Sequence, residues 1–144
     1  MTRLSVLAFL AAGTLPALAI AETPNIDSGE WEFESETSFE GAMEMPGESQ
    51  TSRECVRAED IVDSILQMDD EQGVECSVTD RTVSADSMTY TMSCTDPQGG
   101  SFDIDGEIAF MGDTASGVFD ATMDTEMGEI DMTQTMEGRR IGDC

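Results

Sequence analysis

The feature that most constrains the fold is an alternation of apolar and acidic residues with a period of two. In the stretch 31–39 the aromatic residues stand at odd positions, and glutamates hold even positions. The same alternation recurs over 102–110, 117–124 and 130–136. Successive side chains of a β-strand point to opposite faces of the sheet. The pattern therefore predicts half-buried antiparallel strands with carboxylates on the solvent face.

Two further strands are predicted at 76–83 and 87–94, around a turn at 84–86. A three-residue turn fixes the register of such a hairpin. In that register three pairs face each other on one side: Cys76 with Cys94, Val78 with Met92, and Asp80 with Tyr90.

The segment 58–68 departs from the period of two and predicts a short helix. Its apolar residues, Ile61, Val62, Ile65, Leu66 and Met68, share one helical face, and two acids stand at its N-terminal end. The stretch 41–50 is predicted as a loop. The sequence thus predicts a mainly β protein, an antiparallel curved sheet or small barrel of about seven strands with one short α-helix. Closure of the sheet would hide its strand edges. We expect the helix to cover an opening or an edge that the sheet leaves.

The first 21 residues have the layout of a secretory signal peptide. Arg3 supplies a positive start, an apolar run follows over 4–12, and Ala19-Ile20-Ala21 supplies small residues at the cleavage point. All 31 acidic residues come after Ala21. We expect cleavage between Ala21 and Glu22, a periplasmic or secreted location, and a single domain over 22–144 without a membrane span.

The charge of the mature chain limits its partners and its chemistry. Without Arg3, 31 acids face five arginines, a formal charge of about −26, and the chain has neither histidine nor lysine. Such a surface repels nucleic acid and anionic lipid. The missing histidine and lysine exclude serine triads, cysteine–histidine pairs and Schiff bases. No phosphate-binding or dinucleotide motif is present. We therefore expect no enzyme activity and no cofactor.

Four cysteines remain after cleavage, and in an exported domain they imply two disulfides with three connectivities. Zinc ligation is disfavoured because the chain has no C-x-x-C motif and no histidine. The hairpin register favours a cross-strand bridge between Cys76 and Cys94. By exclusion Cys55 then joins Cys144, which closes a long loop and ties down the C-terminus.

Several strings of the chain resemble a family of exported bacterial proteins catalogued as domain of unknown function 3617. They are Gly29-Glu30-Trp31-Glu32, Met45-Pro46-Gly47, the four cysteine positions, and the ending Gly138-Arg139-Arg140-Ile141-Gly142-Asp143-Cys144. The resemblance implies a periplasmic or secreted location and the four-cysteine framework, but no reaction. Members place Thr-Pro where this chain has Arg57-Ala58, so we expect a weakly capped helix start.

The first functional hypothesis is an exported, non-enzymatic protein that binds a small apolar ligand or supports the cell envelope. If the strands close around their apolar faces, methionine and aromatic side chains line the interior and adapt to apolar guests. The candidate ligand-binding residues are Trp31, Tyr90, Met92, Phe102, Phe119 and Met132, and Phe33, Phe110 and Met136 line the same interior. A packed core without a cavity is the alternative for a domain of this size.

Two other hypotheses use different residues. The second hypothesis is the binding or carriage of copper(I), because Met43 and Met45 form an M-x-M pair in the predicted loop and thioether sulfurs suit this ion. A carboxylate hydrolase needs an acid in an apolar pocket, and Asp80, predicted inward beside Tyr90, is the best candidate. The structural alternative for Asp80 is an ion pair with an inward-facing Arg53.

Overall fold

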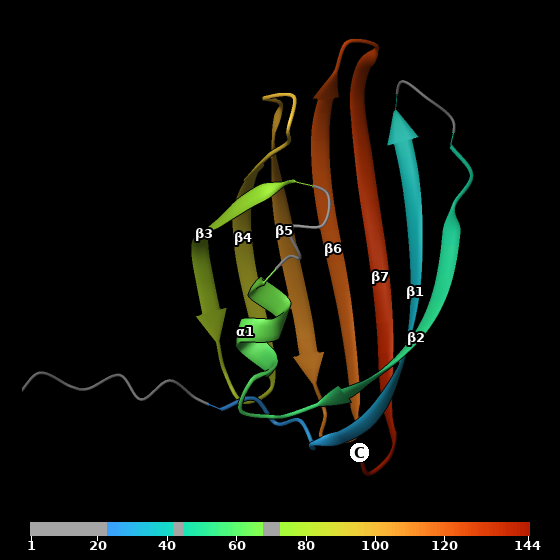
Figure 1. Ribbon diagram of the computed structural model, residues 1–144, viewed down its shortest axis with the longest axis vertical. Helices are drawn as coiled ribbons and strands as arrows, with labels where there is room; N and C mark the ends of the chain where they lie inside the picture. Colours follow the sequence, from blue (N-terminus) through green and yellow to red (C-terminus); the bar gives the residue numbers. More distant parts are fainter. Residues whose placement is uncertain (1–22, 42–44, 68–72) are drawn as a thin grey trace, which may run out of the picture.

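The computed structural model describes residues 23–41, 45–67 and 73–144, so the predicted signal peptide lies outside the described residues. The described chain folds into one seven-stranded antiparallel sheet and one short helix (Figure 1). The strands follow the order β2-β1-β7-β6-β5-β4-β3, which leaves β2 and β3 at the two edges. Their bounds are β1 Gly29–Gly41, β2 Glu48–Val56, β3 Glu75–Val83, β4 Ser87–Thr95, β5 Ser101–Phe110, β6 Thr114–Thr125 and β7 Gly128–Gly142.

The predicted fold class is confirmed, and the sheet is curved and open rather than closed into a barrel (Figure 1). Every neighbouring pair of strands is antiparallel, as the alternation of apolar and acidic residues requires. The predicted loop at 41–50 is too long, because β2 already begins at Glu48.

The helix α1, Ile61–Leu66, lies in front of the sheet in Figure 1. In the sequence it follows β2 and precedes β3, the two edge strands. It is shorter than the predicted 58–68: Asp60 is its N-cap, and Gln67 already has an extended backbone conformation. No side-chain hydrogen bond caps its start, which confirms the expected weak cap. Its apolar residues are half-buried against the core.

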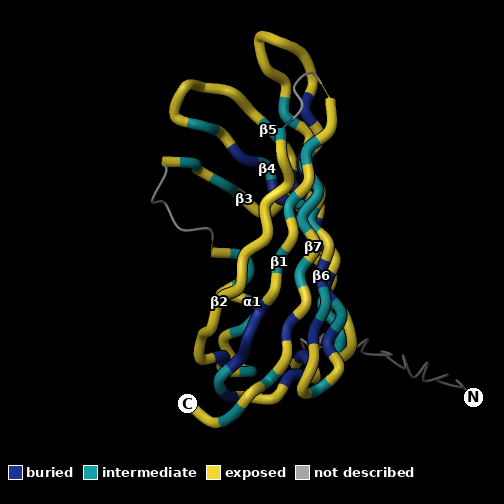
Figure 2. Tube along the Cα trace, turned by 90° about the vertical axis from the view of Figure 1, so that its right-hand side faces the viewer, coloured by how far each residue is buried: buried dark blue, intermediate teal, exposed yellow. Residues whose placement is uncertain are grey.

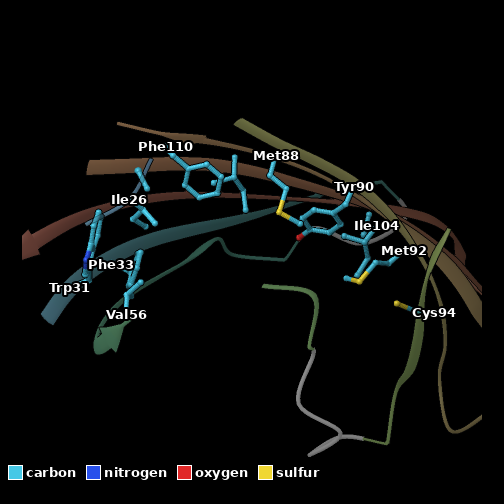
Figure 3. Close-up of a cluster of buried hydrophobic side chains, with 13 residues drawn as sticks. Ile26, Trp31, Phe33, Val56, Met88, Tyr90, Met92, Cys94, Ile104 and Phe110 are labelled. Atoms are coloured by element: carbon cyan, nitrogen blue, oxygen red, sulfur yellow. The ribbon is translucent and has the colours of Figure 1, made fainter. Parts of the chain in front are cut away.

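One face of the sheet, here called the inner face, carries the core and α1, and the other is the outer face. Figure 3 shows the core side chains beneath the curved strands, with Trp31, Phe33 and Val56 toward one end and Tyr90 and Met92 toward the other. Figure 2 shows that the strand ends at the top of the view are largely exposed. The complete buried apolar set is Ile26, Trp31, Phe33, Val56, Met88, Tyr90, Met92, Cys94, Ile104, Ile108, Phe110, Ala115, Ala121 and Ile130.

The β3–β4 hairpin confirms two predicted pairs and corrects the third. Cys76 faces Cys94 and Val78 faces Met92, but the register then shifts between Val78 and Asp80. An extra residue in a strand turns every later side chain to the opposite face. Asp80 therefore lies opposite Thr91 and is exposed on the outer face, so the prediction that it faces Tyr90 is wrong.

Both predicted disulfides are present in the structure. Cys76 and Cys94 are bridged with their Cα atoms 4.1 Å apart, and Cys55 and Cys144 with theirs 5.7 Å apart. The second bridge ties the edge strand β2 to the C-terminus across 89 residues of sequence. Paired disulfides are typical of proteins outside the cytoplasm. Within the described ranges, no helix is long and apolar enough to cross a membrane.

Arg53 does not face inward, which corrects another prediction. It lies opposite Glu32 in the β1–β2 register, on the outer face. Its guanidinium donates to Oε2 of Glu32 over 2.8 and 2.6 Å, while Arg139 of β7 donates to Oε1. One carboxylate thus joins three adjacent strands, and its pKa is lowered by the hydrogen bonds from Arg139 and Arg53.

Candidate functional site

The strongest candidate site is a pocket between α1, β2 and the inner face of the sheet. Its volume is about 300 Å³, at the small end of the range for ligand pockets. Most of its wall is apolar: Ile26, Phe33, Val56, Ile61, Ile65, Ile108, Phe110, Ala115 and Met136. We call it the inner pocket.

Large and small side chains lie side by side in this part of the inner face. On the inner face Phe110 stands opposite Ala115, which stands opposite Gly138, which stands opposite Phe33. The ring of Phe33 lies over Gly138, where an added Cβ would come within 2.5 Å of its Cε1 atom. The Phe33 ring thus covers Gly138, and Ala115 is the small lining residue between Phe33 and Phe110 in the wall. The helix lies over this part of the sheet, and none of its residues is fully buried.

The polar residues of the inner pocket lie near the end of β2, in the turn that follows it, and on the helix. They are Glu54, Arg57, Asp60 and Ser64. Arg57 forms an ion pair with Asp60, with Nε and Oδ2 3.3 Å apart, and both side chains are largely exposed. This polar rim faces solvent, while the apolar wall lies against the sheet.

Two of the strings that carry the family resemblance meet beside the inner pocket. Gly29-Glu30-Trp31-Glu32 opens β1, and the ending 138–144 closes β7, its antiparallel neighbour. Trp31 is fully buried, stacks on Phe33 with ring centroids 5.8 Å apart, and donates from Nε1 to the Asp27 carbonyl over 2.9 Å. Arg140 donates from Nε to the Ser28 carbonyl and pairs with Asp143. Together these contacts fix the strand that presents Phe33 to the inner pocket.

The six candidate ligand-binding residues occupy other parts of the inner face. Trp31, Tyr90 and Met92 are buried in the core, while Phe102, Phe119 and Met132 are half-buried. Tyr90 and Phe119 form a tilted aromatic pair with centroids 6.4 Å apart. Burial raises the pKa of Tyr90 to about 12. The residues that line the inner pocket include none of these six.

Several lining residues escaped the sequence argument. Phe33, Phe110 and Met136 were expected in the interior, but Ile26, Val56 and Ala115 were not nominated. Ile61 and Ile65 belong to the predicted apolar face of the helix. The apolar face of a helix packs against another apolar surface. This face is the sequence feature that indicates the inner pocket.

The residues of the other two hypotheses are not brought together. Met43 lies outside the described residues, and Met45 is half-buried ahead of β2. Asp80 is on the outer face, where it lines a separate hollow of about 260 Å³ together with Asp105, Glu107 and Asp120. In the part of the chain that the structure describes, no three histidine, cysteine or acidic side chains gather as a metal-binding group.

A larger hollow of about 540 Å³ lies over the middle of the sheet and is mainly an outer-face feature. Four glutamates line it, Glu34, Glu36, Glu107 and Glu137, together with small, polar and a few apolar residues. Its acidic lining gives it a different character from the inner pocket.

The fold and the inner pocket define a disulfide-linked, open antiparallel half-barrel with a helix-covered inner face. The family model described as "Protein of unknown function (DUF3617)" matches residues 26–144, and the chain belongs to this family. Neither a curated protein nor a solved structure shows a significant match to it.

Proposed function

We propose that this protein binds a small apolar molecule in the inner pocket, in the periplasm or after secretion, and performs no catalytic step. The observation that carries the proposal is the apolar wall shared by β1, β5, β6, β2 and α1 around a volume of about 300 Å³. Ligand pockets are typically apolar hollows with a few polar groups at one side, and the inner pocket has this distribution.

The helix supports the proposal because it covers the pocket incompletely. Ile61 and Ile65 are half-buried, although both face the core. An apolar guest would take the remaining surface of these side chains and of Met136 out of water, at about 25 cal/mol per Å². A flexible methionine in the wall accommodates guests of different shape.

The chemistry of the rim supports binding rather than catalysis. Its ionisable groups are Glu54, Arg57 and Asp60, and the last two neutralise each other. Histidine is the side chain that most often transfers protons at neutral pH, and the chain has no histidine.

The test is a titration of the purified mature protein with decan-1-ol, a neutral single-chain molecule. We expect a saturable rise in melting temperature and a shift in the emission of Trp31, because Trp31 stacks on a wall residue of the pocket. Without either response, in decan-1-ol or in a branched isoprenoid alcohol, the proposal fails.

A matched pair of variants places the binding. Ala115 lines the inner pocket, whereas Val118 is exposed on the outer face of the same strand. Ala115→Ile should fill the pocket and abolish the response, and Val118→Ile should leave it unchanged. Equal responses in both variants would place the binding elsewhere.

A further inference from the structure

The rim of the inner pocket carries an excess of negative charge. Arg57 is already paired with Asp60, so Glu54 is the uncompensated group among the rim residues. Glu54 lies opposite Trp31 in the β1–β2 register, which directs its side chain to the inner face. It is exposed, and in the described ranges no arginine forms an ion pair with it.

The other arginines cannot balance this charge. Arg53 and Arg139 are bound to Glu32 on the outer face, and Arg140 is bound to Asp143. Arg81 lies opposite Tyr90 on β3, at the far edge of the sheet order, and does not line the inner pocket. An anionic head group at the rim would therefore face a carboxylate without a counter-ion, in the field of a chain of formal charge −25.

We propose that the ligand of the inner pocket is a cationic amphiphile, with its alkyl chain against the apolar wall and its ammonium head beside Glu54. This inference rests on the proposed function and names the ligand class for the same site. The apolar wall selects the chain, and the rim selects the sign of the head group. The alternative ligands, with an anionic or a neutral head group, place the same alkyl chain against the apolar wall. They differ from the cationic amphiphile only in the group that lies at the rim.

The experiment compares three ten-carbon ligands, decylammonium, decan-1-ol and decanoate, each below its micelle concentration or solubility limit, by calorimetric titration at low salt. We expect decylammonium to bind most tightly and decanoate least, with about a tenfold difference between these two. The difference should shrink at high salt because the rim is exposed.

The matched variants are Glu54→Gln and Glu48→Gln. Both residues belong to β2 and to the same face, but six positions apart, about 20 Å along the strand. Glu54→Gln should weaken decylammonium binding about fivefold and leave decan-1-ol binding unchanged. Glu48→Gln should change neither.

The outcomes separate this inference from the proposed function. If decan-1-ol binds but decanoate binds as tightly as decylammonium, the cationic ligand class is wrong and the pocket stands. If Glu48→Gln weakens decylammonium as much as Glu54→Gln does, the general surface field and not the rim selects the head group, which overturns the inference. If decylammonium still binds to Ala115→Ile, it is adsorbed on the acidic surface, which also overturns the inference. If none of the three ligands binds, the proposed function fails first.

Discussion

The ring of Tyr90 occupies the space that a side chain at Gly106 would need. The two residues face each other on β4 and β5, and a Cβ added at Gly106 would come within 2.5 Å of Cε1 of the ring. Gly106 is buried in the middle of a strand, where glycine is otherwise unfavourable. Its presence is explained by the close approach of this ring to the backbone.

Replacing Gly106 with alanine should destabilise the fold by about 1–3 kcal/mol, because the Tyr90 ring must leave its place in the core. Urea denaturation of Gly106→Ala measures this loss. In a Tyr90→Ala background the same substitution should cost much less, since the ring that it displaces is gone. Equal costs in both backgrounds would contradict the explanation.

Tyr90 should also make the protein sensitive to alkaline pH. Burial raises the pKa of Tyr90 from its ordinary value of 10.0 to about 12. A raised pKa in the folded state gives stability that is fully present below the unfolded pKa and is lost as pH rises through the folded pKa. This difference in pKa corresponds to on the order of 2–3 kcal/mol of stability, lost between about pH 10 and 12.

The measurement is clean because Tyr90 is the only tyrosine, the chain has no lysine, and its cysteines are paired. Absorbance near the tyrosinate band gives the folded pKa directly, and chemical denaturation gives the stability at each pH. Tyr90→Phe is the control and should show no such loss over this range.

The strands were predictable from the sequence because one face of each is apolar and the other is acidic. The sequence predicts the Cys76–Cys94 pair from a three-residue turn, but Val83 faces Met88 across a four-residue turn, and the extra residue between Val78 and Asp80 restores the predicted pair. The sequence does not predict this bulge, because the added residue leaves the apolar pattern that precedes it unchanged. Arg53 was misplaced because charge alone does not tell which face of an edge strand a residue occupies.

The inner pocket was not predictable at residue level. Its wall forms where Ala115 of β6 lies opposite Phe110 on one side and opposite Gly138, which the Phe33 ring covers, on the other, and these adjacencies depend on the register between strands. The sequence marks small residues but not which of them become neighbours. The apolar face of the helix indicates that the helix covers an apolar surface. The curvature of the sheet determines which part of the inner face lies beneath the helix.

Removing the bridge between Cys55 and Cys144 should cost about 4.6 kcal/mol, because it closes a loop of 89 residues. Removing the bridge between Cys76 and Cys94, 18 residues apart, should cost about 3 kcal/mol. Paired cysteine-to-serine variants and denaturant titrations measure both. A peptide map of the unreduced protein should contain these two links and no free thiol, and a link from Cys55 to Cys76 would contradict the connectivity.

Like charges face each other on the outer face of the sheet. Glu137 of β7 lies directly opposite Glu34 of β1. Such pairs are destabilising, so Glu137→Gln should raise the stability by about 0.2–1 kcal/mol at low salt. Near 1 M salt the gain should vanish, because the screening length falls to about 3 Å.

Glu107 provides the comparison for this prediction, because its cross-strand neighbours are Thr89 and Val118. Glu107→Gln should change the low-salt stability less than Glu137→Gln does. A melting temperature of the parent protein that does not rise with salt would show that repulsion between carboxylates contributes little.

Glu32 should be the carboxylate on which the fold depends most. It is 8% exposed, and its two oxygens accept hydrogen bonds from Arg53 and Arg139 on the two strands that flank β1. Glu32→Gln leaves both arginines and removes the charge that they share. We expect a larger drop in melting temperature at neutral pH than for Glu36→Gln, which lies on the same face of β1 opposite Thr135 and Ser49.

The pH dependence distinguishes the charge of Glu32 from its shape. Hydrogen bonds from Arg139 and then Arg53 lower its pKa in the folded state. A lowered pKa gives stability that is present above the unfolded value, about 4.3, and is lost as pH falls through the folded value. The difference in melting temperature between the parent protein and Glu32→Gln should therefore be full at neutral pH and should shrink as the pH falls through the folded pKa of Glu32, where its carboxylate takes up a proton. A difference that persists unchanged in acid would mean that Glu32 stabilises the strands through packing and not through its charge.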